Sequence, residues 1–264
     1  MSLRRNFLTG AYLLRQLVVR DIQSRYKGTV GGALWVVGQP LLMLAIYTLV
    51  FGLVFQPKWD GLGSIWDFSL VLFLGKIPYI YVLDTVGRSP ALMVAHAGYV
   101  KKTQFPLGFL IWMSQASALF VAVVSLFVWG LFYLLIHFDL PPITSLLLPI
   151  IYLPLFFSVG GICYFLSSLG TYFRDVSQIV QPILFSMMFL SPVFYPIHKS
   201  PEWMRGFLEW NPMSQAIEQS RNVIYFGQSM DWHWWGMQML LGILLLILGR
   251  GWFSRTRGGF AEVI

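Results

Sequence analysis

Long uncharged runs alternate with short polar segments along most of this chain. The first run extends from Gly28 to Pro57 without an Asp, Glu, Lys or Arg. At about 1.5 Å per residue, an uncharged helix of about 20 residues crosses the apolar core of a bilayer. The pattern therefore predicts six transmembrane helices. They cover residues 33–55, 68–90, 107–136, 145–171, 177–195 and 233–250.

Residues 3–27 are too polar to span a membrane, but they are patterned as an amphipathic helix. Apolar side chains recur at helical spacing on one face, and polar side chains occupy the other. The apolar face holds Phe7, Ala11, Leu14, Val18 and Ile22. This pattern is typical of a helix lying in the membrane interface. The alternative is a plain cytoplasmic extension with a solvated charged face.

A second polar stretch, residues 197–227, separates the last two predicted spans. Ser200-Pro201-Glu202 has the composition of a helix start, with a capping Ser, Pro at the first position and an acid in the first turn. Asn211-Pro212 is a second helix start of this kind, with a capping residue before Pro, and Gly227 is suited to end the second helix. We predict two short re-entrant or interfacial helices here, called the outer hairpin.

The basic residues predict the orientation of the spans. Arg20, Arg25 and Lys27 directly precede the first span, and Arg250 and Arg255 follow the last. Since cytoplasmic segments carry an excess of Lys and Arg, both termini are predicted to be cytoplasmic. Most of the 18 Lys and Arg residues then lie inside. The exceptions are Lys58, Lys199, Arg205 and Arg221 outside, and Lys76 within a span.

Composition supports this picture. The chain of 264 residues is 57% hydrophobic and only 11% charged, whereas soluble domains carry about 25% charged residues. We predict an all-α integral membrane protein with one transmembrane domain over residues 1–264. The net charge of +7 follows from the topology and needs no nucleic-acid partner. Cys163 is the only cysteine, so an intrachain disulfide is excluded.

Several motifs occur in order along the chain. R-D-x-x-x-R-Y-K-G begins at Arg20 and is followed by G-x-L-W ending at Trp35. K-K-x-x-F-P covers 101–106, F-R-D covers 173–175 and S-P-x-x-Y-P covers 191–196; Asn211, Pro212, Glu218 and Arg221 form N-P-x-x-x-x-x-E-x-x-R. In these motifs the chain resembles the membrane subunits of ABC-2-type transporters that export polysaccharides in O antigen, capsule and teichoic acid pathways. Tyr99 replaces or shifts a Leu that is usual there.

The resemblance implies a permease subunit that moves a lipid-linked polysaccharide across the bacterial inner membrane. It also implies a homodimer with two separate ABC ATPase subunits. The chain has no G-x-x-x-x-G-K-[ST] phosphate loop, so ATP and Mg are expected on the partner subunit and no cofactor on this chain. Export of a drug or a small lipid by a related ABC-2 permease is the alternative function.

The resemblance also implies a coupling surface for the ATPase, built from the amphipathic helix and the cytoplasmic segments. The candidate coupling residues are Arg20, Arg25, Tyr99, Lys101, Lys102, Phe105, Pro106 and Arg174. An ordinary basic loop would explain the two lysines without explaining the Phe-Pro ending.

Candidate residues for the transport pathway are charged or aromatic, and each group also has a structural explanation. Lys76 and Asp84 lie in a predicted span, where an ionisable residue is a functional hypothesis by default; Asp84 can instead pair with Arg88 one turn away. The candidate aromatic residues are Trp35, Phe51, Trp112, Tyr133 and Tyr152, although interfacial belts and core packing account for most rings. The candidate outer gate comprises Asn211, Pro212, Glu218 and Arg221.

An enzyme is the rival class. A membrane glycosyltransferase or acyltransferase needs an acidic or His-centred site near a membrane face. The sequence offers only His137-Phe138-Asp139 and the external Glu202, Glu209 and Glu218. The four His residues are scattered and show no metal-ligand spacing. We therefore predict no catalytic and no metal site.

Overall fold

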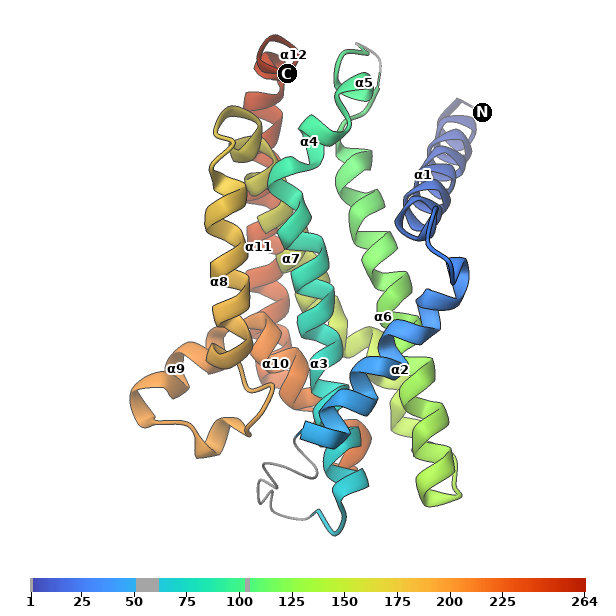
Figure 1. The fold of residues 1–264 in the computed structure, drawn as a ribbon. Coiled ribbons are helices and arrows are strands. Elements are labelled where there is room, and N and C mark those ends of the chain that lie inside the picture. The colour runs from blue at the N-terminus through green and yellow to red at the C-terminus, as the bar shows by residue number, and fades with distance from the viewer. Residues whose placement is uncertain (1, 51–61, 103–104) are drawn as a thin grey trace.

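A computed structural model describes residues 2–50, 62–102 and 105–264, with side chains from residue 10 onward except that of Ala33. The regular elements within these ranges are all helical. Four of them are long: α3 (Ile65–Arg88), α6 (Gly108–His137), α7 (Leu148–Tyr172) and α11 (Trp232–Thr256). They form an elongated bundle (Figure 1).

Four helical segments in the described ranges are long and apolar enough to cross a membrane. They are Ile65–Ala95, Gly108–His137, Ile143–Tyr172 and Trp232–Val263, and they coincide with four of the six predicted spans. The third begins in the short helix η4 (Ile143–Leu147). These lengths of 30 to 32 residues correspond to roughly 45 Å of helix, against about 30 Å of hydrocarbon.

The helices at the other two predicted spans are shorter. The helix α2 covers Trp35–Tyr47, after the short turn η1 (Gly32–Leu34), and the apolar helical stretch continues to Val50. The end of the predicted span 33–55 lies outside the described residues. The helix α8 covers Val176–Leu190, so the predicted end at residue 195 is wrong. Ser191 is extended, because the residue before a proline disfavours the helical conformation.

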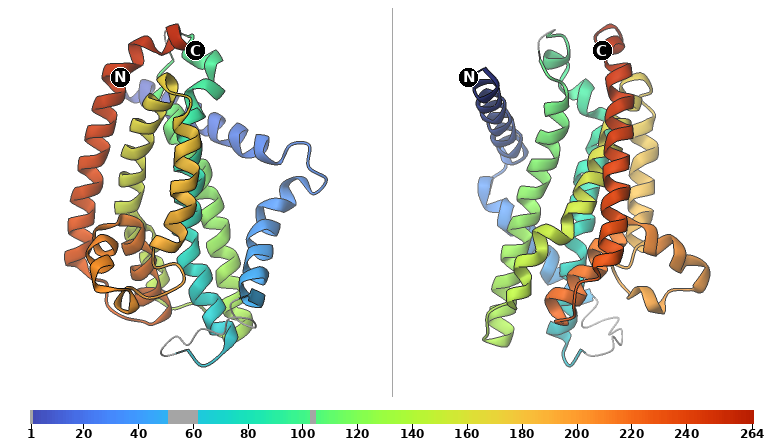
Figure 2. Two further views of the ribbon diagram at one scale, coloured as in Figure 1. Left: turned by 60° about the vertical axis from the view of Figure 1, so that its left-hand side comes forward. Right: turned by 180° about the vertical axis from the view of Figure 1, so that it is seen from behind.

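The first helix, α1 (Ser2–Tyr26), runs across the long helices instead of along them, as the left view of Figure 2 shows. It packs against α6. Leu17 is buried and Leu14, Val18 and Ile22 are half-buried, whereas Ala11 is exposed. The predicted apolar face is therefore the one turned towards the bundle, and Phe7 lies among the residues whose side chains are not described.

Glycines bring α7 and α11 into close backbone contact. A side chain at Gly161 would overlap the backbone of Leu245, and one at Gly249 would overlap the carbonyl of Gly161. The Gly160-Gly161 pair thereby allows the two helices to pack closely. Pro154 is accommodated inside α7, and Gly242 packs against its carbonyl oxygen.

The helix α3 is the centre of the bundle, since most of its residues are buried. It leads into three short helices, η3 (Ser89–Ala91), α4 (Leu92–Ala95) and α5 (Ala97–Val100). The C-terminal helices η7 (Arg257–Gly259) and α12 (Phe260–Val263) lie at the same end of the bundle as α5 and the start of α1 (Figure 1). Both termini are thus on one side.

The outer hairpin lies towards the opposite end. It contains η5 (Ile197–Lys199), α9 (Glu202–Trp210), α10 (Pro212–Ser220) and a widened turn, η6 (Arg221–Tyr225). The prediction for Asn211 is confirmed, because its side chain caps α10 by accepting a hydrogen bond from Met213 N. Gly227 follows the helix with a left-handed φ of 64°.

The predicted cap at Ser200 is corrected. Pro201 is itself the N-terminal capping residue of α9, and the Ser200 hydroxyl donates to the Ile197 carbonyl instead. Asp175 occupies the capping position of α8 but makes no side-chain cap hydrogen bond there. The two helices also differ in burial: α10 is mostly buried against α3 and α7, whereas α9 exposes Trp203, Phe207 and Trp210.

Candidate functional site

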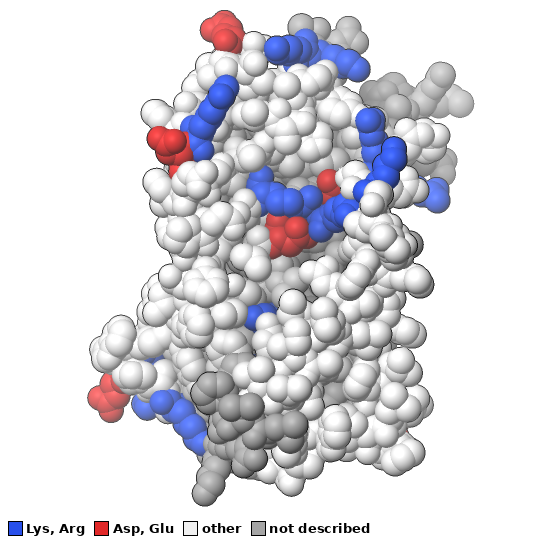
Figure 3. All heavy atoms as spheres, viewed as in Figure 1, with Lys and Arg blue, Asp and Glu red and all other residues white. Residues whose placement is uncertain are grey.

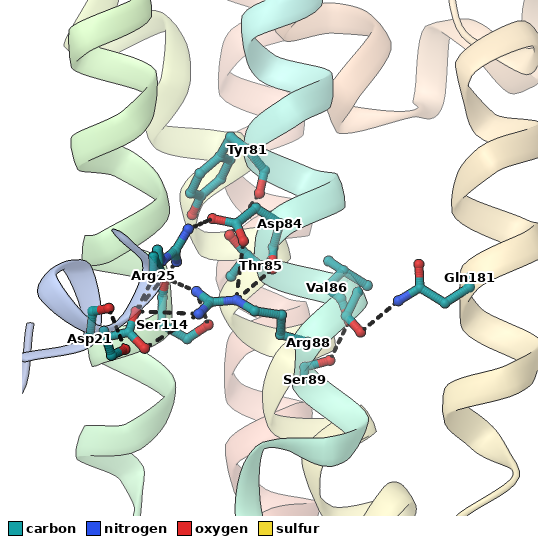
Figure 4. A network of polar contacts seen from close by, with 12 residues as sticks. Asp21, Arg25, Tyr81, Asp84, Thr85, Val86, Arg88, Ser89, Ser114 and Gln181 are labelled. Carbon is teal, nitrogen blue, oxygen red and sulfur yellow. Dashed lines mark hydrogen bonds and ion pairs between the residues drawn. The ribbon is translucent and has the colours of Figure 1, made fainter. Parts of the chain in front are cut away.

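Four charged side chains join α1 to α3 on the side of the bundle that carries the termini. Arg25 Nη1 lies 2.6 Å from Asp84 Oδ2, and Arg25 also reaches Asp21 at 3.3 Å. Arg88 bridges the same two carboxylates, at 3.3 Å from Asp21 and 3.1 Å from Asp84. We call these four residues the ionic cluster; Figure 4 shows all four turned towards one another.

A third helix is tied to the ionic cluster. Arg88 donates hydrogen bonds to the backbone carbonyl and the hydroxyl of Ser114 on α6. At the residue before Arg88, Gln181 of α8 donates to the carbonyl of Gly87 (Figure 4). The cluster therefore fixes α1 to a point where α3 also meets α6 and α8.

The charges of the cluster stabilise one another. Burial alone would raise the pKa of the Asp21 carboxyl, but the cations of Arg88 and Arg25 and the Ser117 hydroxyl hold it below its usual value. The pKa of Arg25 is likewise raised, because Asp84 and Asp21 outweigh the effect of burial. Asp21 and Arg25 are therefore charged at neutral pH.

The sequence predicted parts of this cluster in separate roles. Asp84 was a pathway candidate and Arg25 a coupling candidate, and the structure brings them together. The alternative pairing of Asp84 with Arg88 is confirmed. Asp21 and Ser114 were missed as site residues. For Asp21 a signal existed, since its spacing of four residues from Arg25 predicts an ion pair on a helix.

A cavity of about 590 Å³ lies beside the ionic cluster, between α1 and the segment after α3. Arg20, Asp21 and Ser24 line one side, and His96, Tyr99 and Lys102 line the other. Arg20 donates a hydrogen bond of 3.3 Å to the Tyr99 hydroxyl across it. This hollow carries the basic side chains of Arg20 and Lys102 and lies at the terminal end of the bundle.

Three of the eight predicted coupling residues, Arg20, Tyr99 and Lys102, line this cavity. The Tyr99 ring lies 4.7 Å from Phe105, and the Lys102 ammonium lies 5.6 Å from the centre of the Tyr99 ring. Lys101 and Pro106 are exposed next to them. Arg174 is also exposed, on the separate turn between α7 and α8. The structure thus groups these candidates on one end; the role in coupling stays a prediction.

Lys76 is buried near the middle of α3, with 4% of its surface exposed. Its Nζ lies 4.9 Å from the ring centre of Tyr47 on α2, 4.7 Å from Tyr79 and 5.7 Å from Phe194. It also donates to the sulfur of Met188 on α8, at 2.9 Å. The predicted intramembrane cation therefore sits in an aromatic surrounding.

The aromatic pathway candidates are scattered. Trp35 is 46% exposed at the start of α2. Trp112 stacks on Phe156 and meets the edge of Tyr164, which is packing between α6 and α7. Tyr133 stacks on His137 near the end of α6, and Tyr152 is half-buried on α7. Phe51 lies outside the described residues.

Arg221, a gate candidate, is a buried structural centre of the outer hairpin. Its guanidinium donates to the carbonyls of Val71 on α3 and of Pro192 and Val193 after α8. It also packs against Gly75, where a side chain would overlap it. Glu218, one turn before Arg221 on α10, is half-buried. Burial lowers the pKa of Arg221 to about 10, against the opposing charge of Glu218.

His137, which the sequence offered only as part of a candidate enzyme site, forms a polar contact near the outer hairpin. His137 Nε2 lies 3.0 Å from Asp67 Oδ1, and the His137 ring stacks on Tyr133 and meets Tyr225 edge-on. This arrangement ties α6 to the start of α3 and to η6. Within the part of the chain that the structure describes, no group of three His, Cys, Asp or Glu residues is placed to hold a metal ion.

The distribution of charge defines the class of protein. Figure 3 shows the charged side chains of one face gathered in bands, with a wide and mostly uncharged zone between them. Together with the long apolar helices, this defines a helical protein of the membrane. The chain belongs to the ABC-2 type transporter family, whose sequence profile matches residues 12–225.

Curated relatives cover the chain along nearly its whole length. It is 28% identical to an O-antigen export system permease protein, RfbA, of Klebsiella pneumoniae over 100% of both chains. It is 26% identical to RfbA of Myxococcus xanthus over 96% of this chain and 95% of the other. It is also 23% identical to the polysialic acid transport protein KpsM of Escherichia coli, over 85% of each.

Proposed function

We propose that this chain is the membrane-spanning permease subunit of an ABC transporter that exports a lipid-linked polysaccharide across the bacterial inner membrane. The observation that carries the proposal is the full-length similarity to permeases named for O-antigen export. Relatives named for polysialic acid transport and for capsule polysaccharide export match 85% and 98% of this chain. The common property of these names is a polysaccharide cargo, which favours a glycan over a drug or a small lipid.

The proposal includes six spans with both termini cytoplasmic. The helices α2 and α8 complete the set, although each is shorter than the four long helices. Both termini lie at one end of the bundle (Figure 1), as an even number of spans requires. That end carries Lys101, Lys102, Arg255 and Arg257, and basic residues mark the cytoplasmic side. The helix α1 then lies in the inner interface, where its charged face meets the headgroups.

Energy is proposed to come from a separate ATPase subunit that binds ATP and Mg. The sequence has no phosphate-binding loop of its own. The ATPase would dock at the terminal end, on the surface around the cavity lined by Arg20, Tyr99 and Lys102. Two copies of this chain would form the complete membrane part, because six spans are half of a typical ABC membrane domain. Asn211, Pro212, Glu218 and Arg221 would frame the exit at the outer side.

Deletion of the gene tests the proposal directly. We expect surface polysaccharide to disappear and lipid-linked glycan to accumulate inside the cell, with both restored by a plasmid copy. Restoration should also require an ATPase subunit with an intact phosphate loop, which should copurify with this chain. Unchanged surface polysaccharide in the deletion strain would contradict the proposal, and altered drug sensitivity alone would favour the alternative cargo.

A further inference from the structure

Within the described part of the chain, Lys76 has no counter-ion for its charge. Among the residues that the structure describes, no carboxylate pairs with Lys76 and no oxygen accepts a hydrogen bond from it. An ammonium has three N–H donors. Here one donates to the Met188 sulfur, a weak acceptor, and the rest of the group faces aromatic rings.

The nearest carboxylates on the same helix are far away and already engaged. Asp84 lies eight residues from Lys76, which is about 12 Å along α3, and it is held by Arg25 and Arg88. Asp67 lies nine residues in the other direction, about 13.5 Å along α3, and contacts His137. Among the residues described, Lys76 is therefore a cation without a counter-ion, halfway along a helix that spans the membrane.

The side chains around the Lys76 ammonium are held in place by contacts with neighbouring helices. The Tyr79 ring is fixed beside the ammonium because its hydroxyl donates to the Leu184 carbonyl on α8. Tyr47 comes from α2 and Phe194 from the segment after α8. Since α2 and α8 pack on different sides of α3, the ammonium contacts residues from both of its flanking helices.

A cation in this place is suited to receive an anion within the bilayer. A charge at the bilayer centre is costly unless it is paired, so both the lysine and a passing anionic headgroup gain from pairing there. The fixed negative charge of membrane lipids is a phosphoryl group, which accepts several hydrogen bonds from an ammonium. The flanking rings exclude water, which lowers the local dielectric constant and so strengthens the attraction between the ammonium and an anion.

We propose that Lys76 is a binding site for the phosphoryl group of a lipid-linked substrate, halfway along its route through the membrane. This inference rests on the proposed function for the identity of the cargo. The aromatic rings of Tyr47, Tyr79 and Phe194 hold the ammonium in the absence of substrate, and the flexible lysine side chain moves away from them when the phosphoryl group arrives. The same chemistry is offered by free phosphate, so the lipid part of the inference needs its own test.

The experiment uses the full-length chain in vesicles of phosphatidylcholine and measures binding of undecaprenyl phosphate. The variants are Lys76→Met, which keeps the length and removes the charge, and Lys76→Arg, which keeps the charge. Lys27→Met is the matched control, because Lys27 is an exposed lysine at the end of α1. Undecaprenol, inorganic pyrophosphate and phosphatidylglycerol are the comparison ligands.

We expect undecaprenyl phosphate to bind wild type and Lys27→Met equally, and Lys76→Met about tenfold or more weakly. Lys76→Arg should retain binding, and undecaprenol should bind all variants weakly. Equal binding by wild type and Lys76→Met would overturn the inference. If Lys76→Met does not fold, the inference is tested on the wild-type protein. Equal affinity of the wild type for undecaprenol and undecaprenyl phosphate would exclude a phosphoryl site.

The other ligands separate the sources of the phosphoryl group. Competition by pyrophosphate or phosphatidylglycerol as strong as that of undecaprenyl phosphate would remove the lipid-linked substrate from the inference. The outcome is independent of the deletion experiment. Loss of surface polysaccharide with Lys76-independent binding would refute this site and leave the proposed function, and the reverse result would refute the function and leave the site.

Discussion

Arg221 joins three segments that are far apart in the sequence. Its guanidinium donates to carbonyls of α3 and of the turn after α8, and its own backbone begins the widened turn η6. The residue is 1% exposed. A buried arginine in this position holds the outer hairpin against the bundle, because its guanidinium donates to both segments at once.

Replacing Arg221 by Ala should therefore destabilise the protein by about 3 kcal/mol or more, since several buried acceptors lose a charged donor. Thermal unfolding of the purified chain, followed by size-exclusion chromatography, measures this loss. Arg205→Ala is the control, because Arg205 also donates to two carbonyls but is only partly buried within the hairpin. Equal midpoints for wild type and Arg221→Ala would contradict the structural role.

A second prediction at the residue scale concerns Asp21. Because its pKa in the folded protein lies below the ordinary value of 3.8, the stabilisation from its ion pairs is complete above that value. It is lost as the pH falls through the folded pKa. Asp21→Asn should remove this contribution at every pH, at a cost of roughly 1.5–3 kcal/mol near neutrality.

The measurement is the unfolding midpoint as a function of pH between 7 and 3 for wild type and Asp21→Asn. The two curves should be separated at neutral pH and converge in acid. Asp175→Asn serves as the control, because Asp175 is exposed and makes no side-chain cap hydrogen bond. Parallel curves for wild type and Asp21→Asn would mean that the ion pairs at Asp21 contribute nothing.

At the scale of elements, the pair of α7 and α11 depends on small residues. In a membrane the close approach of two helices is driven by packing, which small residues permit. Gly161 lies directly against the backbone of Leu245 and Leu246. We expect Gly161→Ala to destabilise the protein by about 1–3 kcal/mol, since the added methyl forces the helices apart.

Gly251→Ala is the matched control for Gly161→Ala, because it makes the same change on α11 where nothing lies within 4 Å of the added atom. Thermal unfolding in one detergent compares the two. Gly251→Ala should lose no stability, since Ala is the better helix former. Similar midpoints for both variants would show that the helices tolerate a wider separation.

The sequence predicted elements better than their connections. Hydropathy located the four long helices, because a bilayer demands long apolar runs. The Asn211 cap was also predictable, as it is local. The end of α8 was predicted five residues too late, since its apolar run continues past Pro192 and hydropathy does not register a backbone break. The burial of Arg221 was missed because its partners are carbonyls, which every residue carries.

In the candidate site, too, local pairs could be predicted from the sequence, whereas contacts between separate helices could not. The i,i+4 pairing of Asp84 with Arg88 was available from spacing, whereas the contact of α1 with both was not. That contact depends on how an interfacial helix lies across the bundle, which periodicity alone does not determine. Trp112 was a pathway candidate by composition, but its stacking on Phe156 is a property of the α6 and α7 packing.

At the scale of the whole molecule, the orientation in the membrane is testable. Single cysteines placed in a Cys163→Ser background should react with a membrane-impermeant maleimide according to side. We expect labelling from outside at Ser64, Asp139 and Ser229, and only after permeabilisation at Lys101 and Glu262. Labelling of position 101 from outside would show that the protein has the opposite orientation in the membrane. The proposed ATPase surface would then be on the wrong side.

The last prediction concerns the coupling of this chain to its ATPase. Lys101, Lys102 and Phe105 lie at the terminal end, where the cavity beside α1 offers a basic and aromatic surface. They are peripheral to the bundle, since Lys101 and Lys102 are exposed and Phe105 is half-buried. A triple variant with both lysines changed to Glu and Phe105 to Ala should therefore insert and fold normally.

The same triple variant should lose ATPase association, because a partner surface that is complementary to two cations and a ring meets repulsion and a void instead. Copurification and stimulated ATP hydrolysis measure this loss, and export should fall with them. Lys199→Glu, at the opposite end of the bundle, is the control for a charge reversal on the surface. Normal association by the triple variant would reduce the segment to a basic loop and move the coupling surface to α1 or to the turn at Arg174.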